Sequence, residues 1–145
     1  MKDLSNPPWT WQRSGSPFTQ KIVTDLIKDE YTGFVYLITR IKDGKFYVGK
    51  KLLRFKKRVK SKGKRARISY VESDWKTYWG SSKELQADVE KLGTAAFKRE
   101  IISVCKGKQI LSYYELLCQI ERNVMIPETN SYNQIINVRL RIHRK

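Results

Sequence analysis

The sequence predicts a small α/β domain of the α+β kind, in which helices flank an antiparallel sheet of three strands. Two runs rich in β-branched and aromatic residues, 33–41 and 45–48, surround an Asp-Gly turn, which is a strong hairpin signal. A third such run spans 97–105, and two longer segments show the spacing of amphipathic helices. At 145 residues and 17.1 kDa, the chain has the size of one domain.

Residues 1–30 are expected to form an N-terminal arm that precedes the domain proper at 31–145. Three of the four prolines and two of the four tryptophans lie in the first 19 residues, which show little periodicity. Trp9 and Trp11 could stack on nucleic-acid bases, but packing of the arm against the domain is the simpler interpretation. The end of the arm, 21–28, could be a short helix or a strand.

Positive charge is concentrated in one segment. The chain holds 30 Lys and Arg against 14 Asp and Glu, a formal net charge of +16 at pH 7, and such a field attracts polyanions. Residues 44–71 contain twelve Lys or Arg and no acid. The spacing of Leu52, Phe55 and Val59 predicts a basic helix, followed by a mobile basic insertion at 60–73. The apolar stripe of this helix is too short to enter a membrane, so a nucleic acid is the expected partner.

The second half of the chain alternates helix and strand. Residues 81–84 resemble a capping box and Gly93 supplies a stop, which together predict a helix between them. A strand is expected at 97–105, and a long helix at 109–125, before Pro127. The inward face of the long helix is predicted to carry Leu117, Ile120 and Val124.

The residue types present exclude several kinds of chemistry. The only cysteines, Cys105 and Cys118, form no CxxC motif, so buried, reduced thiols in a reducing compartment are expected. The single histidine, His143, is interpreted as a solvated residue of the basic tail, which leaves no His-based metal site and no Ser-His-Asp triad. There is no Gly-rich phosphate loop and no apolar run of about 18 residues that could span a membrane. We therefore expect a cytoplasmic protein.

Two short motifs carry a family resemblance. Gly33-Phe34-Val35-Tyr36 and Tyr47-Val48-Gly49 lie on either side of the predicted hairpin turn, and together they resemble the signature of the GIY-YIG nucleases. The resemblance covers 33–137 and is closest to small stand-alone phage members, including the phage endonuclease II group, without the extra DNA-binding domain of homing members. It implies a small GIY-YIG-like fold and a divalent-metal-dependent nuclease in the cytoplasm of a bacterium or of a phage's host.

The resemblance also implies roles for particular residues. The family places an arginine on the helix after the second motif, which matches Arg58, although a different register would select Arg54. It places a metal-binding glutamate on a long helix, which matches Glu115. The catalytic set that the resemblance implies is Tyr36, Tyr47, Arg58, Glu115 and Asn133.

Hydrolysis of a phosphodiester needs an activated water, a counter-charge for the phosphate and help for the leaving oxygen. Glu115 is a hard oxygen ligand suited to Mg²⁺ or Mn²⁺. Tyr36 could act as a base only if nearby cations or a metal-bound water lowered its pKa, and Tyr47 would position the phosphate or the water. The residues expected to bind the nucleic acid are Gly49, Lys50, Lys51, Arg54, Lys57, Lys62, Lys64, Arg65, Arg67 and Lys76, with Gly49 leaving room for a phosphate.

Simpler explanations exist for several of these residues. Glu115 is the third residue after Ser112, the place of a capping-box glutamate, and Asn133 could be a turn residue. For the whole chain, the alternative is a non-catalytic basic nucleic-acid-binding protein of the ribosomal or architectural type. The favoured function is a metal-dependent endonuclease that hydrolyses double-stranded DNA. The oligomeric state stays open, with a homo-oligomer among the alternatives.

Overall fold

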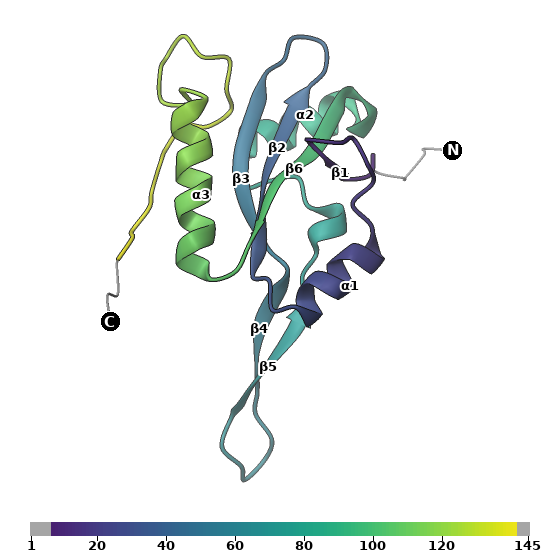
Figure 1. The fold of residues 1–145 in the computed structure, drawn as a ribbon, viewed down its shortest axis with the longest axis vertical. Helices are drawn as coiled ribbons and strands as arrows, with labels where there is room; N and C mark the ends of the chain where they lie inside the picture. The colour runs from purple at the N-terminus through teal and green to yellow at the C-terminus, as the bar shows by residue number, and fades with distance from the viewer. Residues whose placement is uncertain (1–6, 142–145) are drawn as a thin grey trace.

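The computed structural model describes residues 7–141 and has a mixed α/β fold built on one four-stranded sheet (Figure 1). The strand order is β1-β6-β2-β3, with bounds Thr10–Trp11, Phe97–Cys105, Gly33–Arg40 and Phe46–Leu52. The central strand β2 is antiparallel to both β3 and β6, whereas β1 runs parallel to β6. The predicted fold class is confirmed, with one strand more than predicted in the main sheet. His143 lies outside the described residues.

The sheet is covered on both faces because its side chains alternate between two apolar clusters. On β2, Phe34, Tyr36 and Ile38 point into the larger cluster. This cluster is closed by the N-terminal segment and by helices α1 (Gln20–Lys28) and α2 (Lys83–Leu92). The other face, which includes Val35 and Val48, packs against helix α3 (Lys108–Glu121).

The ends of helix α2 lie where the sequence predicts them. The Ser82 hydroxyl accepts a hydrogen bond from the backbone N–H of Leu85 at 3.2 Å, which satisfies one of the free donors of the first turn. At the other end Gly93 caps the helix with a φ of 87°, a value that favours glycine. The segment at 20–28 is a helix and not a strand, with Thr19 as its N-cap.

The predicted basic helix after β3 is wrong. Strands β4 (Arg54–Val59) and β5 (Arg67–Glu72) pair there as a two-stranded antiparallel ribbon, joined by 60–66. The ribbon extends away from the rest of the molecule (Figure 1). The apolar stripe that suggested a helix has no surface to pack on, since Phe55 is 39% exposed, and buried Leu53 instead anchors the start of the ribbon. The predicted mobile insertion at 60–73 is also partly wrong, because its second half is β5.

The inward face of helix α3 also differs from the prediction. Leu117 and Ile120 are exposed, and of the three predicted inward residues only Val124 is buried. The helix packs instead through Leu111, Cys118 and Gln119. Apolar residues occur on both sides of this helix, so their spacing alone could not select the buried side. What we call the outer face of α3 consists of five residues that are 37–56% exposed: Ile110, Tyr113, Tyr114, Leu117 and Ile120.

The N-terminal segment is part of the core. Trp9 is 2% exposed, packs edge-on against Phe34 with ring centroids 5.3 Å apart, and donates its indole N–H to the carbonyl of Trp75 at 2.8 Å. Packing, not base stacking, is therefore the role of Trp9. Cys105 and Cys118 are buried free thiols, as predicted, and burial raises the pKa of both. No helix among the described residues is long and apolar enough to cross a membrane.

A buried arginine, which the sequence does not single out, connects distant segments. Arg99 on β6 is 1% exposed, and its guanidinium carbon lies 4.6 Å and 4.5 Å from the ring centroids of Trp9 and Trp79. Its N–H groups donate to three backbone carbonyls, those of Lys76 (3.0 Å), Tyr78 (2.9 Å) and Pro7 (2.7 Å). Burial lowers the pKa of Arg99 to about 10, so it stays charged at neutral pH.

Candidate active site

The two signature motifs meet in one close contact. Tyr36 on β2 and Gly49 on β3 are directly opposite each other in the antiparallel register. A Cβ atom placed on Gly49 would clash with the Tyr36 hydroxyl, and one placed on Gly80 would lie 3.3 Å from the same oxygen. The Tyr36 hydroxyl thus lies between two glycines. The space above Gly49 that was expected to admit a phosphate is occupied by this hydroxyl.

Tyr36 is a buried phenol. It is 1% exposed, and the rings of Tyr47 and Tyr78 lie 6.1 Å and 5.9 Å from it, centroid to centroid. Burial raises the pKa of Tyr36 well above its ordinary value, and the neighbouring Tyr78 and Tyr47 raise it further. The cations that were expected to lower this pKa do not do so. The phenol therefore keeps its proton at neutral pH.

Lys51 was predicted to bind a nucleic acid, but its charge is neutralised within the fold. Its side chain is 8% exposed, and its Nζ lies 2.5 Å from Oδ1 of Asp74 and 3.8 Å from the ring centroid of Tyr78. The same ion pair lowers the pKa of Asp74. Lys51 thus holds the 74–78 loop against β3.

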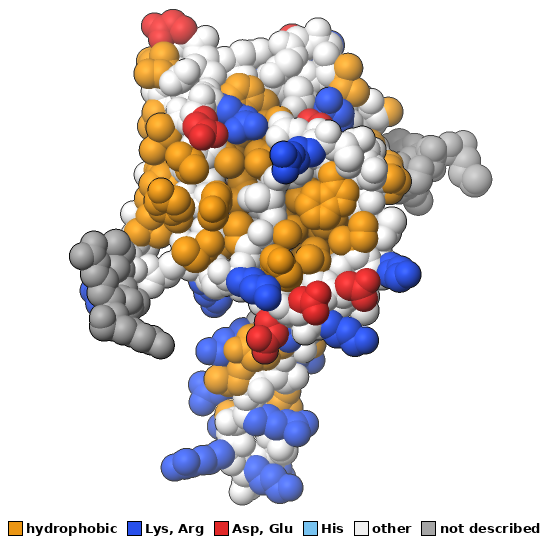
Figure 2. All heavy atoms as spheres, in the orientation of Figure 1, with side chains coloured by type: hydrophobic (Ala, Val, Ile, Leu, Met, Phe, Trp, Pro, Cys, Tyr) orange, Lys and Arg blue, Asp and Glu red, His pale blue; other side chains and the backbone are white. Residues whose placement is uncertain are grey.

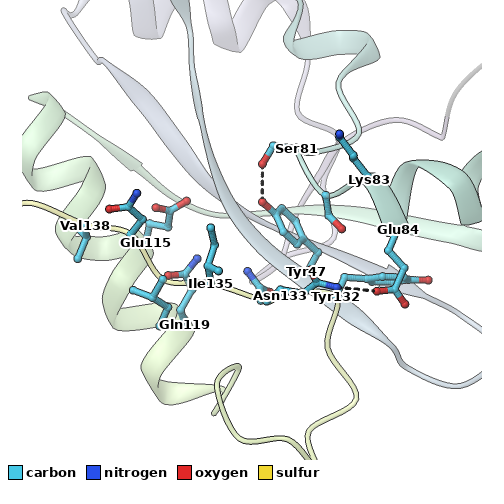
Figure 3. Close-up of a pocket in the computed structure, with 14 residues that line it drawn as sticks. Tyr47, Ser81, Lys83, Glu84, Glu115, Gln119, Tyr132, Asn133, Ile135 and Val138 are labelled. Carbon is cyan, nitrogen blue, oxygen red and sulfur yellow. Dashed lines mark hydrogen bonds between the residues drawn. The ribbon is translucent and has the colours of Figure 1, made fainter.

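A pocket of about 470 Å³ opens at the edge of the sheet beside Tyr47. The Tyr47 hydroxyl and Oγ of Ser81, the residue before the N-cap of α2, are hydrogen-bonded at 2.8 Å (Figure 3). Helix α3 contributes Glu115 and Gln119 from the opposite side, and the segment 132–138 closes the pocket between them (Figure 3). Four separate parts of the chain therefore converge on this pocket.

Glu115 lies in this pocket next to a lysine from β3. Its side chain is 19% exposed, and the closest approach of its carboxylate to Nζ of Lys50 is 3.9 Å. Lys50 in turn donates to the hydroxyl of Ser112 at 2.6 Å. Burial raises the pKa of Glu115, while the Lys50 charge acts in the opposite direction. Because α3 begins at Lys108, Ser112 lies inside the helix, so the capping-box explanation of Glu115 is wrong.

The pocket lies at the edge of the sheet that β3 forms. Strand β3 is the last strand on this side, and alternation along it directs Tyr47 to one face and Lys50 to the other. Tyr47 reaches Ser81 on the first face, and Lys50 reaches Ser112 on the second. The edge position allows groups from both faces to act on one bound molecule.

Asn133 completes the edge of β3. Its Oδ1 accepts from the N–H of Val48 at 3.0 Å, and its Nδ2 donates to the carbonyl of Val48 at 2.9 Å. Gln119 donates to the same carbonyl at 3.2 Å, and Tyr132 donates its N–H to the carbonyl of Phe46 at 2.7 Å. Asn133 therefore pairs with the backbone of β3 and not with Glu115. Gln119 was not singled out from the sequence, because a glutamine within an amphipathic helix gives no distinct signal.

The residues of the pocket fit a single hard cation at Glu115. Among residues 7–141 there is no cluster of three or more His, Cys, Asp or Glu that could hold a metal ion. Mg²⁺, however, is commonly bound by one or two carboxylates and keeps several waters. The ion pair of Glu115 with Lys50 is long, whereas Glu84 in the same pocket is paired with Lys45 at 2.6 Å. Glu115 is thus the carboxylate that remains suited to Mg²⁺ or Mn²⁺.

None of the predicted basic residues lines the pocket, although Lys50 lies next to it at Glu115. Arg58 is on β4, nine residues beyond Gly49, which is roughly 30 Å of extended chain at ~3.3 Å per residue. The helix expected to bring Arg58 to Tyr36 does not form, so the structure does not place this arginine in the site. Lys76 is exposed beside Trp75, with its Nζ 5.7 Å from that ring. The other predicted DNA-binding cations lie, like Arg58, on the ribbon of β4 and β5: Arg54, Lys57, Lys62, Lys64, Arg65 and Arg67.

Comparison with known families agrees with this geometry. The family model described as "Putative endonuclease segE, GIY-YIG domain" matches residues 11–137, which is most of the chain. Comparisons with curated proteins and with solved structures give no match. The match includes both signature motifs and every residue that lines the pocket except Val138. The chain therefore belongs to the GIY-YIG endonuclease family and is a nuclease that acts on DNA.

Proposed function

We propose that this nuclease hydrolyses phosphodiester bonds of double-stranded DNA with one divalent metal ion, Mg²⁺ or Mn²⁺, held by Glu115. The observation that carries the proposal is the pocket at the edge of β3, which Glu115 lines on one side and Tyr47 and Ser81 on the other, with Lys50 next to Glu115. A bound ion would supply Lewis acidity for the leaving oxygen. The remaining requirements are met by side chains that line this pocket or lie next to it.

The hydroxyls of Tyr47 and Ser81 are suited to hydrogen-bond a phosphate oxygen or the attacking water, since they are already held 2.8 Å apart. Lys50 supplies positive charge for the phosphate, the role that the sequence suggested for Arg58. Tyr36 is buried with its ring 6.1 Å from that of Tyr47, so we assign it a positioning role, and the burial that raises its pKa disfavours a role as the base. Asn133 positions Tyr47 and Lys50 indirectly, by holding Val48 between them.

The metal requirement can be tested with supercoiled plasmid DNA. We expect nicked or linear plasmid in the presence of Mg²⁺ or Mn²⁺ and intact plasmid in EDTA, because Lys50 and the hydroxyls alone do not stabilise the leaving oxygen. Restoring the metal to the chelated sample should restore cleavage. Cleavage at full rate in EDTA would contradict the proposal. A duplex oligonucleotide should be cut faster than either of its single strands.

We also propose that the chain self-associates through the outer face of α3. This face exposes apolar side chains over the region of α3 (Figures 1 and 2), and contiguous exposed apolar surface marks interaction sites. Residues 109–121 contain no Lys or Arg. Two copies of a chain with a net charge of +16 repel each other, so they approach most easily where cations are missing.

Light scattering coupled to size-exclusion chromatography tests this association. We expect the wild-type chain to elute as a dimer and the Leu117→Lys/Ile120→Lys variant as a monomer, because a lysine on each copy would bring like charges together. Ile41→Lys is the matched control: Ile41 is 63% exposed but lies at the end of the β2–β3 hairpin, so this variant should stay dimeric. A wild-type chain that is monomeric at every concentration would contradict the proposal.

A further inference from the structure

The basic ribbon consists of β4, β5 and the connecting residues 60–66. Residues 54–72 contain nine Lys or Arg and a single acid, Glu72. That acid lies at the base of the ribbon, where it accepts a hydrogen bond from Gln20 at 2.6 Å. The ribbon projects from the body of the protein with Lys and Arg side chains along its length (Figure 2). The pocket that we assign to catalysis includes no residue of the ribbon.

The cations occupy both faces of the ribbon. In its antiparallel register, Lys56 lies opposite Tyr70 and Arg58 opposite Ile68, and these side chains share one face. Lys57, opposite Ser69, and Arg67, opposite Val59, share the other face. All four cationic residues are exposed. A ribbon that simply lay along one phosphate backbone would need cations on one face only.

The charges of the ribbon are not balanced within the protein. None of the ion pairs found among residues 7–141 uses a cation of the ribbon. In the β4–β5 register no cation lies directly opposite another, but Lys56 and Arg58 share one face of β4 only two residues apart, about 7 Å at ~3.4 Å per residue, so like charges repel along the strand. A two-stranded hairpin by itself is at best marginally stable in water. A partner with negative charge on both sides of the ribbon would remove this repulsion.

We propose that the basic ribbon inserts into the major groove of double-stranded DNA, with each face directed at the phosphates of one strand. One sheet layer with its side chains is about 10 Å thick, judged from the ~10 Å spacing of packed sheets. The major groove is about 12 Å wide and admits such a ribbon, whereas the minor groove of about 6 Å does not. This inference rests on the proposed function in so far as it takes duplex DNA as the substrate.

The same geometry distinguishes DNA from RNA. The major groove of an A-form RNA duplex is deep and narrow, so it excludes a ribbon of this thickness. Each strand of the ribbon has six residues, which is about 20 Å at ~3.4 Å per residue. That length matches roughly six base pairs at ~3.4 Å each. The ribbon therefore holds the duplex over a short stretch, separate from the pocket that cuts it.

The two-face arrangement can be tested by the salt dependence of binding to a 30-base-pair DNA duplex, measured in EDTA by fluorescence anisotropy. Lys56→Ala/Arg58→Ala removes two cations from one face, and Lys57→Ala/Arg67→Ala removes two from the other. Each pair should make the slope of log K against log salt shallower by about 1.8, and all four substitutions by about 3.6, since each phosphate contact contributes ~0.9. The matched control, Lys42→Ala/Lys91→Ala, removes two exposed lysines outside the ribbon and should leave the slope unchanged.

The outcomes separate the possible modes of binding. A change in slope for one face only would show that the ribbon lies flat on one backbone, and no change for either face would show that it does not bind DNA; both results overturn the proposal. Circular dichroism of each variant shows whether the fold is intact, and the spectrum of the control variant Lys42→Ala/Lys91→Ala serves as the reference. Binding in EDTA does not depend on cleavage. A protein that fails to cut plasmid can therefore still confirm that the basic ribbon binds DNA.

Dimethyl sulfate identifies the groove directly, because it methylates guanine N7 in the major groove and adenine N3 in the minor groove. At saturating wild-type protein we expect protection of guanine N7 that disappears in the variant with all four substitutions. Ribbon-dependent protection of adenine N3 instead would overturn the assignment to the major groove. With a 30-base-pair RNA duplex, the four substitutions should change the salt slope by less than half of the change seen with DNA.

Discussion

Glu115→Gln is expected to lower the rate of DNA cleavage by roughly 10³-fold, the upper range for the loss of a group that stabilises charge in a transition state. Glutamine keeps the size of the side chain but not its charge, so the pocket no longer attracts a divalent cation. DNA affinity measured in EDTA should rise, because the substitution removes a negative charge from the surface that meets the phosphate. Loss of cleavage combined with tighter binding would separate the chemical role of Glu115 from a structural one.

Initial rates of plasmid nicking, together with calorimetric titration of Mn²⁺, measure these effects. Glu84→Gln is the matched control, since Glu84 lines the same pocket but is paired with Lys45. This control should keep most of the activity and bind Mn²⁺ normally. A Glu115→Gln protein that cuts at the wild-type rate would refute the assignment, and loss of Mn²⁺ binding in Glu84→Gln alone would move the metal site to Glu84.

Arg99→Met is expected to reduce the free energy of unfolding by about 3 to 5 kcal/mol, because each of three partly buried carbonyls that lose their donor costs up to about 1–3 kcal/mol and relaxation of the fold recovers part of the sum. Methionine fills the space between Trp9 and Trp79 but leaves three carbonyls without a partner. Arg99→Lys should recover less than half of the loss, since an ammonium can neither stack as a guanidinium does nor keep the same fork of donors.

Urea unfolding followed by tryptophan fluorescence gives this free energy. Lys98→Met is the control on the same strand, because the Lys98 side chain is 57% exposed and should change the stability by less than about 0.5 kcal/mol. The Arg99 variants should also cut DNA more slowly under conditions where they remain folded, since the loop at 76–80 leads to Ser81. A loss of stability below about 1 kcal/mol would show that water replaces the arginine at these carbonyls.

Elements with local signals were predicted correctly. The Asp-Gly turn between two β-rich runs predicts the β2–β3 hairpin, and the serine cap and Gly93 predict both ends of α2. Glu115 was assigned to α3 from the family resemblance, and the structure places it in the pocket. The residues around Glu115 could not be predicted from the sequence. Lys50 comes close to Glu115 and Ser112 only because α3 packs on the sheet.

Elements that depend on distant partners were predicted poorly. Residues 54–59 suit a helix or a strand by composition, and β5, which decides between them, begins eight residues after β4 ends. Arg99 has the composition of a surface residue, and only tryptophans far away in the sequence make its burial possible. The capping-box pattern at 81–84 explains Ser81 as part of a helix start. Its hydrogen bond with Tyr47, 34 residues away, has no signal in the sequence.

The contact between Tyr36 and Gly49 restricts how far apart the two signature motifs can lie along the chain. The two residues face each other across the hairpin, and the tyrosine hydroxyl fills the volume that a side chain at position 49 would need. Insertions at the turn leave this pairing unchanged, whereas an insertion within either strand moves Tyr36 opposite Val48 or Lys50. In related chains, therefore, the distance between the motifs can vary only through the turn, and a larger residue at the glycine position must be accompanied by a smaller one at the tyrosine position.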